Sequence, residues 1–181
     1  MGYDLYLELL QSTVAELKKK AEQGEDADQA AIDPEINLHL AAFLPESYIA
    51  DTSQRYHIYR RISAAGSQGP DELADLREEL EDRYGNLPRE AGTLLQIIGL
   101  KHQLREFGIQ KLEQGPRALV FSFADNAPVD PRSILELIES TARDKTVIRL
   151  TPDQRLVVPI EESTDIFLKI RDILSRLKKN P

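Results

Sequence analysis

Residues 45–88 read PESYIADTSQRYHIYRRISAAGSQGPDELADLREELEDRYGNLP, and this stretch predicts two consecutive helices. The first helix has three good N-cap residues at its start, Asp51, Thr52 and Ser53. Its apolar side chains share one face at the helical repeat: Ile58, Tyr59 and Ile62. Residues 66–70 (GSQGP) are expected to separate it from the second helix.

The second helix is expected to begin at Pro70 and Asp71, because proline suits the first helical turn. Its apolar residues follow an i, i+3, i+7, i+11 pattern: Leu73, Leu76, Leu80 and Tyr84. Gly85 is expected to end it in a left-handed conformation. Pro88 then suits the start of the next helix.

Acidic residues form a second stripe on this helix, opposite the leucines. Glu72, Asp75, Glu79 and Asp82 recur at i, i+3, i+7 and i+10, and we call this set the acidic ridge. Like charges at these spacings repel, so the ridge costs helix stability unless something basic faces it. Two interpretations remain open: a solvated face partly offset by nearby arginines, or a docking ridge for a basic partner.

The same stretch resembles a known family. The runs PE-x-YI-x-D, QR, YRRI and LREELEDRYGNLP resemble the carboxy-terminal domain of bacterial transcription-repair coupling factor. The likeness continues through Leu100-Lys101, residues 107–109 and Gly115-Pro116. Residues 2–10 resemble the segment that leaves that protein's motor module, and the likeness is dense up to about Phe123.

The resemblance implies a non-catalytic, autoinhibitory role within an ATP-dependent DNA translocase that couples stalled transcription to nucleotide excision repair. The domain would fold back on the repair-recruiting amino-terminal module of the same protein and mask its binding surface. The damage-sensing repair ATPase and RNA polymerase would be indirect partners, and direct DNA contact is not expected.

The resemblance also implies a partner-binding site. The acidic pair of the family's Glu-x-x-Asp-Arg-aromatic-Gly motif falls on Glu79 and Asp82. The remaining expected site residues lie beside this pair on the same helix: Glu72, Asp75 and Arg83. One departure is Glu81, which occupies a position where the family commonly has an apolar residue.

Composition excludes several classes of protein. The 181 residues contain no cysteine, so disulfides and thiolate metal sites are impossible. The net charge of -8 disfavours a general nucleic-acid binder. The sequence has no phosphate-binding loop or hydrolase motif, and its three histidines (His39, His57, His102) are widely spaced, so we expect no catalytic centre, metal or cofactor. No signal peptide or apolar span is evident, which makes the cytoplasm the expected location and a membrane partner unexpected.

We expect three parts in the chain, which we take to be a fragment of a longer protein. Residues 1–22 are predicted to form a helix leaving the preceding motor module, 23–31 an acidic linker, and 32–181 the regulatory domain. The fold class expected for the domain is α+β. Its helices should pack around a buried helix at 88–107, with a small, mostly antiparallel sheet built mainly by the last third.

The sheet and its helices are predicted from local patterns. Strands are expected at 36–40, 109–113, 118–123, 146–150 and 155–160. Asp130-Pro131 should begin one helix, and Ser163 or Thr164 should cap the last one.

The alternative function is an accessory nucleic-acid-contacting domain of the same translocase. It would use Arg55, Arg60 and Arg61 of the first helix, although we expect these arginines to pair with neighbouring acids. An enzyme with an unrecognised site would need a polar cleft with converging titratable groups.

Overall fold

The computed structural model describes residues 32–142 and 147–178, which divide into two compact units. Of the described residues, unit 1 comprises Leu40–His102, and unit 2 comprises Ile32–His39 together with the chain from Gln103 onward. The expected boundary between residues 22 and 23 lies outside the described residues. Among those that are described, no helix is long and apolar enough to cross a membrane.

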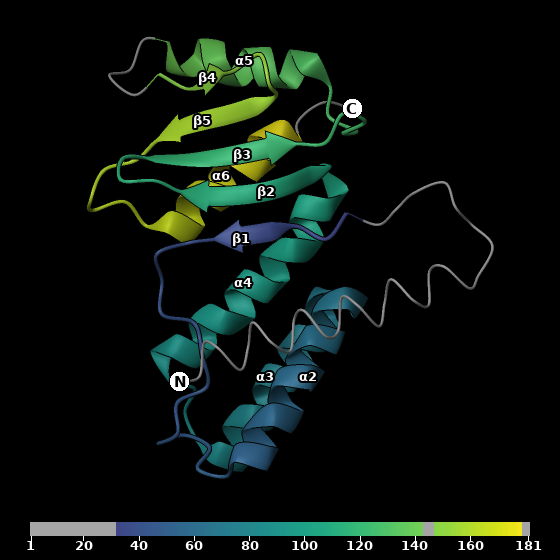
Figure 1. Ribbon diagram of the computed structural model, residues 1–181, viewed down its shortest axis with the longest axis vertical. Helices are drawn as coiled ribbons and strands as arrows, with labels where there is room; N and C mark the ends of the chain where they lie inside the picture. The colour runs from purple at the N-terminus through teal and green to yellow at the C-terminus, as the bar shows by residue number, and fades with distance from the viewer. Residues whose placement is uncertain (1–31, 143–146, 179–181) are drawn as a thin grey trace, which may run out of the picture. The chain divides into compact units, whose positions relative to one another are not determined.

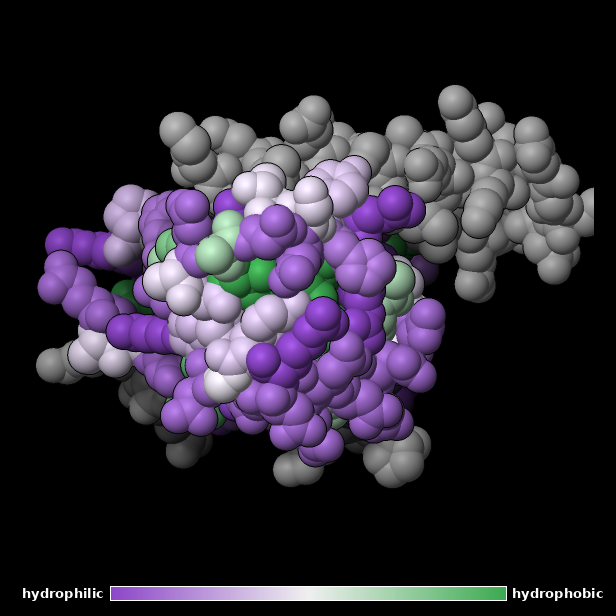
Figure 2. Space-filling view, turned by 90° about the horizontal axis from the view of Figure 1, so that it is seen from below, coloured by the Kyte–Doolittle hydropathy of each residue, from purple (hydrophilic) through white to green (hydrophobic). Residues whose placement is uncertain are grey.

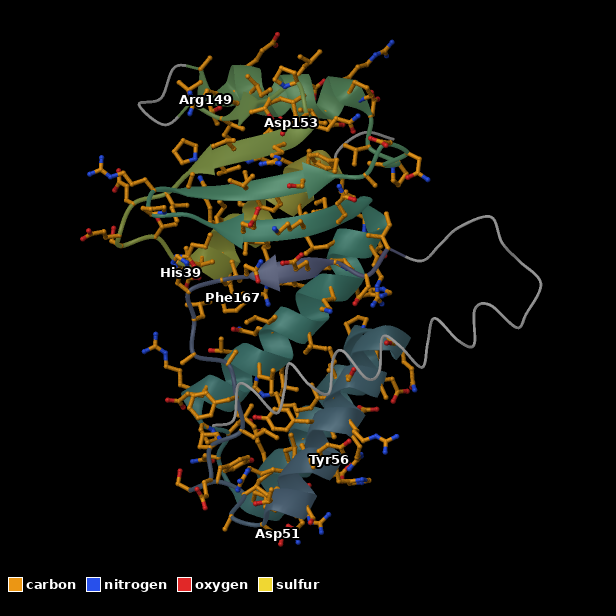
Figure 3. The ribbon with its side chains drawn as sticks, in the orientation of Figure 1. His39, Asp51, Tyr56, Arg149, Asp153 and Phe167 are labelled. Atoms are coloured by element: carbon orange, nitrogen blue, oxygen red, sulfur yellow. The ribbon has the colours of Figure 1, made fainter. Side chains whose placement is uncertain are left out.

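Unit 1 is helical. It contains α2 (Thr52–Gln68), α3 (Pro70–Tyr84) and most of α4 (Arg89–Glu106), which continues into unit 2 (Figure 1). Asp51 is the N-cap of α2, because its side chain accepts a hydrogen bond from the Gln54 N–H at 2.7 Å. Figure 3 shows Asp51 at the start of α2 and Tyr56 further along it.

The break between α2 and α3 is shorter than the sequence suggested. Residues 66–68 belong to α2, so the expected separator at 66–70 reduces to Gly69. Its φ of 139° is available to glycine at little cost, and its N–H bonds to the Ala65 carbonyl. Gly66 lies within α2 and is buried against Ile98 of α4. A Cβ at this position would overlap the Cγ2 methyl group of Ile98, so the packing requires glycine here.

The core of unit 1 joins all three helices to the segment before them. α2 and α3 contribute the apolar faces predicted for them, and α4 is buried as expected. The core residues of the helices are Ile58, Tyr59, Ile62, Ala65, Leu73, Leu76, Leu80, Ala91, Leu94, Leu95 and Ile98. Ala42, Leu44 and Ile49 complete it from the preceding segment. Gly85, at φ 87°, ends α3 as predicted.

Unit 2 contains a five-stranded sheet in the order β1-β2-β3-β5-β4. The strands are β1 (Glu35–Asn37), β2 (Ile109–Gln114), β3 (Ala118–Phe123), β4 (Arg149–Leu150) and β5 (Arg155–Pro159). β1 pairs in parallel with β2, and the other three pairs are antiparallel. The prediction of a mostly antiparallel sheet in an α+β fold is therefore confirmed.

Two edge strands are shorter than expected. β1 ends at Asn37, and the predicted strand at 146–150 is reduced to Arg149–Leu150, with residue 146 outside the described residues. The inner strands β2 and β3 match their predicted ranges closely, and β5 does so to within one residue.

Two helices complete unit 2. α5 (Pro131–Thr141) is capped by Asp130 as predicted, and α6 (Ile166–Leu177) lies behind the sheet in Figure 1. The α6 residues Ile170, Ile173, Leu174 and Leu177 are buried, as are the sheet residues Leu112, Leu119, Phe121, Leu156 and Val158. The predicted cap of α6 is wrong: Asp165 caps it by accepting from the Leu168 N–H, whereas the Thr164 hydroxyl accepts from the Glu161 N–H.

Candidate functional site

The acidic ridge lies on the exposed side of α3. Leu73, Leu76 and Leu80 bury the opposite side, so their helical spacing turns all four ridge acids toward solvent. Glu72 also lies in the first turn of α3, where a carboxylate stabilises the positive end of the helix dipole. The structure thus brings the predicted acids to one face, and Glu72 has a local reason to be acidic.

Glu79 is held by an arginine from the neighbouring helix. Arg61 of α2 donates from Nη1 to Oε1 and from Nη2 to Oε2, both at 2.6 Å, and we call this pair the Arg61–Glu79 fork. Its hydrogen bonds lower the pKa of the Glu79 carboxyl, with smaller contributions from the Arg83 and His57 charges. The same bonds raise the pKa of Arg61. The basic group that the ridge requires is therefore supplied, at Glu79, by the domain itself.

The other ridge acids have no such partner. Among the described residues, Glu72, Asp75 and Asp82 form no ion pair and no side-chain hydrogen bond, and all three are exposed. The Arg83 guanidinium carbon lies 5.4 Å from the centre of the Tyr84 ring, a cation–π contact. The predicted site residues therefore differ in their contacts. Glu79 forms an ion pair with Arg61, whereas the remaining acids of the ridge are exposed to solvent.

Glu81 is accommodated despite its departure from the family pattern. It is half-buried on α3, and its carboxylate pairs with Arg77 one turn earlier at 3.1 Å. An i, i+4 pair of this kind contributes only a few tenths of a kcal/mol, about 0.3–0.5. The ridge itself is unaffected, because neither residue belongs to it.

The three α2 arginines have different roles. Arg61 pairs with an acid as expected, but the same expectation is wrong for Arg55, which donates to the Ile49 and Ala50 carbonyls at 2.7 and 2.8 Å. It anchors the segment that leads into α2. Arg60 is exposed and makes no ion pair or side-chain hydrogen bond within the described part of the chain.

Two tyrosines position α3, and the sequence patterns did not single out their hydroxyl groups. The Tyr48 hydroxyl donates to the carbonyls of Leu80 and Gly85 at 2.9 and 3.0 Å, at the end of α3. Burial, with the nearby Glu81 charge, raises the pKa of Tyr48 and so keeps this donor protonated. The Tyr84 hydroxyl lies 3.3 Å from the Gln54 side-chain oxygen and links α3 to α2.

The exposed surface of unit 1 is mainly polar. Among its described residues, Tyr56, at 42% exposure, is the single large hydrophobic residue that is exposed. Figure 2 shows the molecule from below, with hydrophilic residues over most of that face and a hydrophobic area near its centre. A partner of this surface would meet charges rather than an apolar patch.

Unit 2 contains a hollow of about 480 Å³ at the start of α5. It is lined by Glu106, Phe107, Pro128, Asp130, Ser133, Leu177 and Lys178. The buried Ser133 hydroxyl has no hydrogen-bond partner within the described residues. Within them there is also no group of three or more residues arranged to hold a metal ion, and His39, the first of the three histidines, is exposed.

The chain is similar to bacterial transcription-repair-coupling factors. It is 35% identical to the protein of Myxococcus xanthus over 99% of this chain, and 35% identical to that of Escherichia coli over 77%. The Bacillus subtilis protein is 28% identical over 76%. The matched regions span only 14%, 12% and 11% of these three relatives, respectively.

A solved structure shares the fold. The crystal structure of the C-terminal domain of transcription-repair coupling factor matches with a TM-score of 0.66 and 22% identity, covering 81% of this chain and 90% of that one. A family model described as the TRCF domain matches residues 38–134, which include the whole acidic ridge. Because this match covers more than half of the residues, the chain belongs to the TRCF domain family.

Proposed function

We propose that this chain is a non-catalytic regulatory domain of a cytoplasmic, ATP-dependent DNA translocase that couples stalled transcription to nucleotide excision repair. It docks its acidic ridge on the repair-recruiting amino-terminal module of the same protein and masks that module's binding surface. The observation that carries the proposal is the row of exposed acids on one face of α3, inside the residues that match the family model.

The chemistry of unit 1 supports a contact that can open. A surface with charged groups and little exposed apolar area recognises its partner through electrostatic complementarity, which favours fast and salt-sensitive association. A regulatory contact must be reversible, because the masked surface has to become available when the motor engages. Charge pairs at a solvated surface meet this requirement better than a large apolar interface does.

The α2 arginines give less support to direct nucleic-acid binding. Phosphate recognition needs several cations on one surface, but Arg61 is engaged by Glu79 and Arg55 by two backbone carbonyls. Of the three, Arg60 alone makes no ion pair or side-chain hydrogen bond within the residues that the structure describes. Duplex DNA binding at physiological salt that disappears in Arg60→Glu would favour the alternative function over the regulatory one.

The test is a titration of this chain against the isolated amino-terminal module of the parent protein. Asp82→Lys is the most direct variant, because Asp82 has no ion pair to lose within the described part of the chain. The double variant Glu79→Lys/Asp82→Lys reverses both acids of the family motif. Glu136→Lys on α5 is the matched control, since it makes the same charge change at an exposed helical acid outside the ridge.

We expect salt-sensitive binding by the wild type and by Glu136→Lys, and a loss of at least about tenfold in affinity for Asp82→Lys. Thermal unfolding of each variant identifies any loss caused by misfolding. Equal binding by the wild type and both ridge variants would show that the ridge is an ordinary solvated surface, and it would reject the proposal.

A further inference from the structure

The Arg61–Glu79 fork occupies the atoms that a docking partner needs. Both carboxylate oxygens of Glu79 accept a hydrogen bond at 2.6 Å, one from each terminal nitrogen of Arg61. A partner's arginine makes its strongest contact with a carboxylate through the same two-bond geometry. It therefore competes with Arg61 for Glu79.

We propose that Arg61 is an internal competitor that sets the affinity of the acidic ridge. A basic side chain of the partner first meets Asp82, which has no ion pair within the described residues, and gains Glu79 only when the fork opens. This inference rests on the proposed function, because it assumes that the ridge is the docking surface.

The exposure of the fork allows the exchange. The side chains of Arg61 and Glu79 are 37% and 44% exposed, so water can solvate either group when the pair separates. Exposed ion pairs contribute little net free energy, because water solvates both charged groups when they separate. A partner can therefore displace Arg61 without unfolding any part of α2 or α3.

The neighbouring charges narrow the kind of partner that fits. Arg83 acts electrostatically on Glu79 together with Arg61, so cations lie near this acid as well as the other ridge carboxylates. A partner carrying many cations would be repelled there once the fork opened. The surface fits a partner with one or two arginines or lysines opposite Asp82 and Glu79, and without further bases opposite Arg61.

The test compares two adjacent arginines in the module titration described above. Arg61→Gln removes the fork, and Arg60→Gln removes the same charge from an exposed neighbour that makes no ion pair within the described residues. Arg61→Lys keeps the charge but loses the two-bond geometry. We expect Arg61→Gln to bind about two- to five-fold more tightly than Arg60→Gln, the range that corresponds to an exposed ion pair. Arg61→Lys should bind more tightly than the wild type.

A partner-free measurement checks the fork itself. In an NMR titration of the free chain, the Glu79 carboxyl should titrate below its ordinary range in the wild type and move back toward it in Arg61→Gln. An unchanged Glu79 titration in that variant would overturn the inference. So would equal affinities of Arg61→Gln and Arg60→Gln, or weaker binding by Arg61→Gln in a chain of unchanged thermal stability.

The two failures are distinguishable. If the wild type does not bind, or if Asp82→Lys binds as well as the wild type, the proposed function fails and the competitor has nothing to regulate. If Asp82→Lys loses binding while Arg61→Gln and Arg60→Gln remain equal, the ridge docks and only the competition is rejected.

Discussion

Glu79 and Asp82 lie one helical turn apart on the same face of α3, yet their surroundings differ. Arg61 holds Glu79 through two hydrogen bonds, whereas Asp82 has no ion pair among the described residues. Both acids belong to the same motif and are exposed. What distinguishes them is a residue eighteen positions before Glu79, on another helix.

The fork makes the contribution of Glu79 to stability depend on pH. The folded-state pKa of Glu79 lies below its ordinary value of 4.5, so its stabilisation is present above that pH and is lost as pH falls through the folded value. We expect Glu79→Gln to lower the thermal stability slightly at neutral pH, with the difference from the wild type vanishing in acid. Thermal unfolding over a pH series measures it.

Glu78→Gln is the control for this pH series. Glu78 is an exposed neighbour on α3 that forms no ion pair with any described residue. Its replacement removes the same charge from α3 without breaking an ion pair of the described residues. A deficit of Glu79→Gln that persists far below pH 4.5 would mean that something other than the ionised carboxylate is lost.

At the scale of the element, the surface of α3 depends on how closely the helices of unit 1 pack. Arg61 reaches Glu79 because α2 and α3 lie side by side, joined by the single residue Gly69. Gly66 near the end of α2 allows close approach to Ile98 of α4. On one side, α2 contacts α3 through the Arg61 side chain. On another side, it contacts α4 at Gly66, which has no side chain.

Two glycines in unit 1 should respond in opposite ways to alanine. A Cβ at Gly66 would overlap the branched Ile98 side chain, which is buried, so Gly66→Ala should destabilise by about 1–3 kcal/mol. A Cβ at Gly99 of α4 would meet Leu73 Cδ1 at 3.6 Å, an ordinary contact. Gly99→Ala should therefore stabilise by up to about 1 kcal/mol through helix propensity.

Denaturant unfolding of the two alanine variants beside the wild type tests this contrast. The pair controls for the general effect of removing a helical glycine. Similar stability changes in both variants would show that there is room for a Cβ at Gly66 between α2 and α4.

At the scale of the whole molecule, the net charge is the property that most affects how a partner approaches. The net charge of -8 creates a field that attracts a basic partner at long range, before any particular side chains meet. Salt screens this field over roughly 10 Å at 0.1 M. The ridge supplies part of that charge, and it is the part that the proposed docking uses.

The affinity for the amino-terminal module should fall several-fold between about 0.05 M and 0.5 M salt, mainly through slower association. Surface plasmon resonance or stopped-flow mixing separates the association and dissociation rates. Asp82→Lys should show a weaker dependence on salt than Glu136→Lys, which carries the same net charge. Binding that is insensitive to salt in the wild type would indicate an apolar contact elsewhere.

The sequence predicted the features that depend on local pattern. The leucines and acids of α3 follow the helical repeat, so their two faces could be assigned from spacing alone, and β2 and β3 could be read from their alternation and the turn between them. The cap of α6 could not be chosen, because Ser163, Thr164 and Asp165 are consecutive residues that all suit the role.

The features that escaped prediction depend on packing between distant segments. The Arg61–Glu79 fork requires the packing of α2 on α3, which no single helix encodes. Arg55 was expected to meet an acid but meets two carbonyls instead, because the chain before α2 turns back toward it. The parallel pairing of Glu35 with Lys111 likewise joins residues that are separated in the chain by the described part of unit 1, Leu40–His102.

That pairing has a consequence for synthesis on the ribosome. β1 emerges first, the helices of unit 1 follow, and only then does β2 appear to receive it. Throughout that interval, β2, the strand that pairs with Glu35–Asn37, has not yet been made. A strand of three residues is a poor template for pairing with another nascent chain, so its shortness protects against aggregation during the delay. The earliest described strand must therefore wait until α2, α3 and α4 have been made before it can join the sheet.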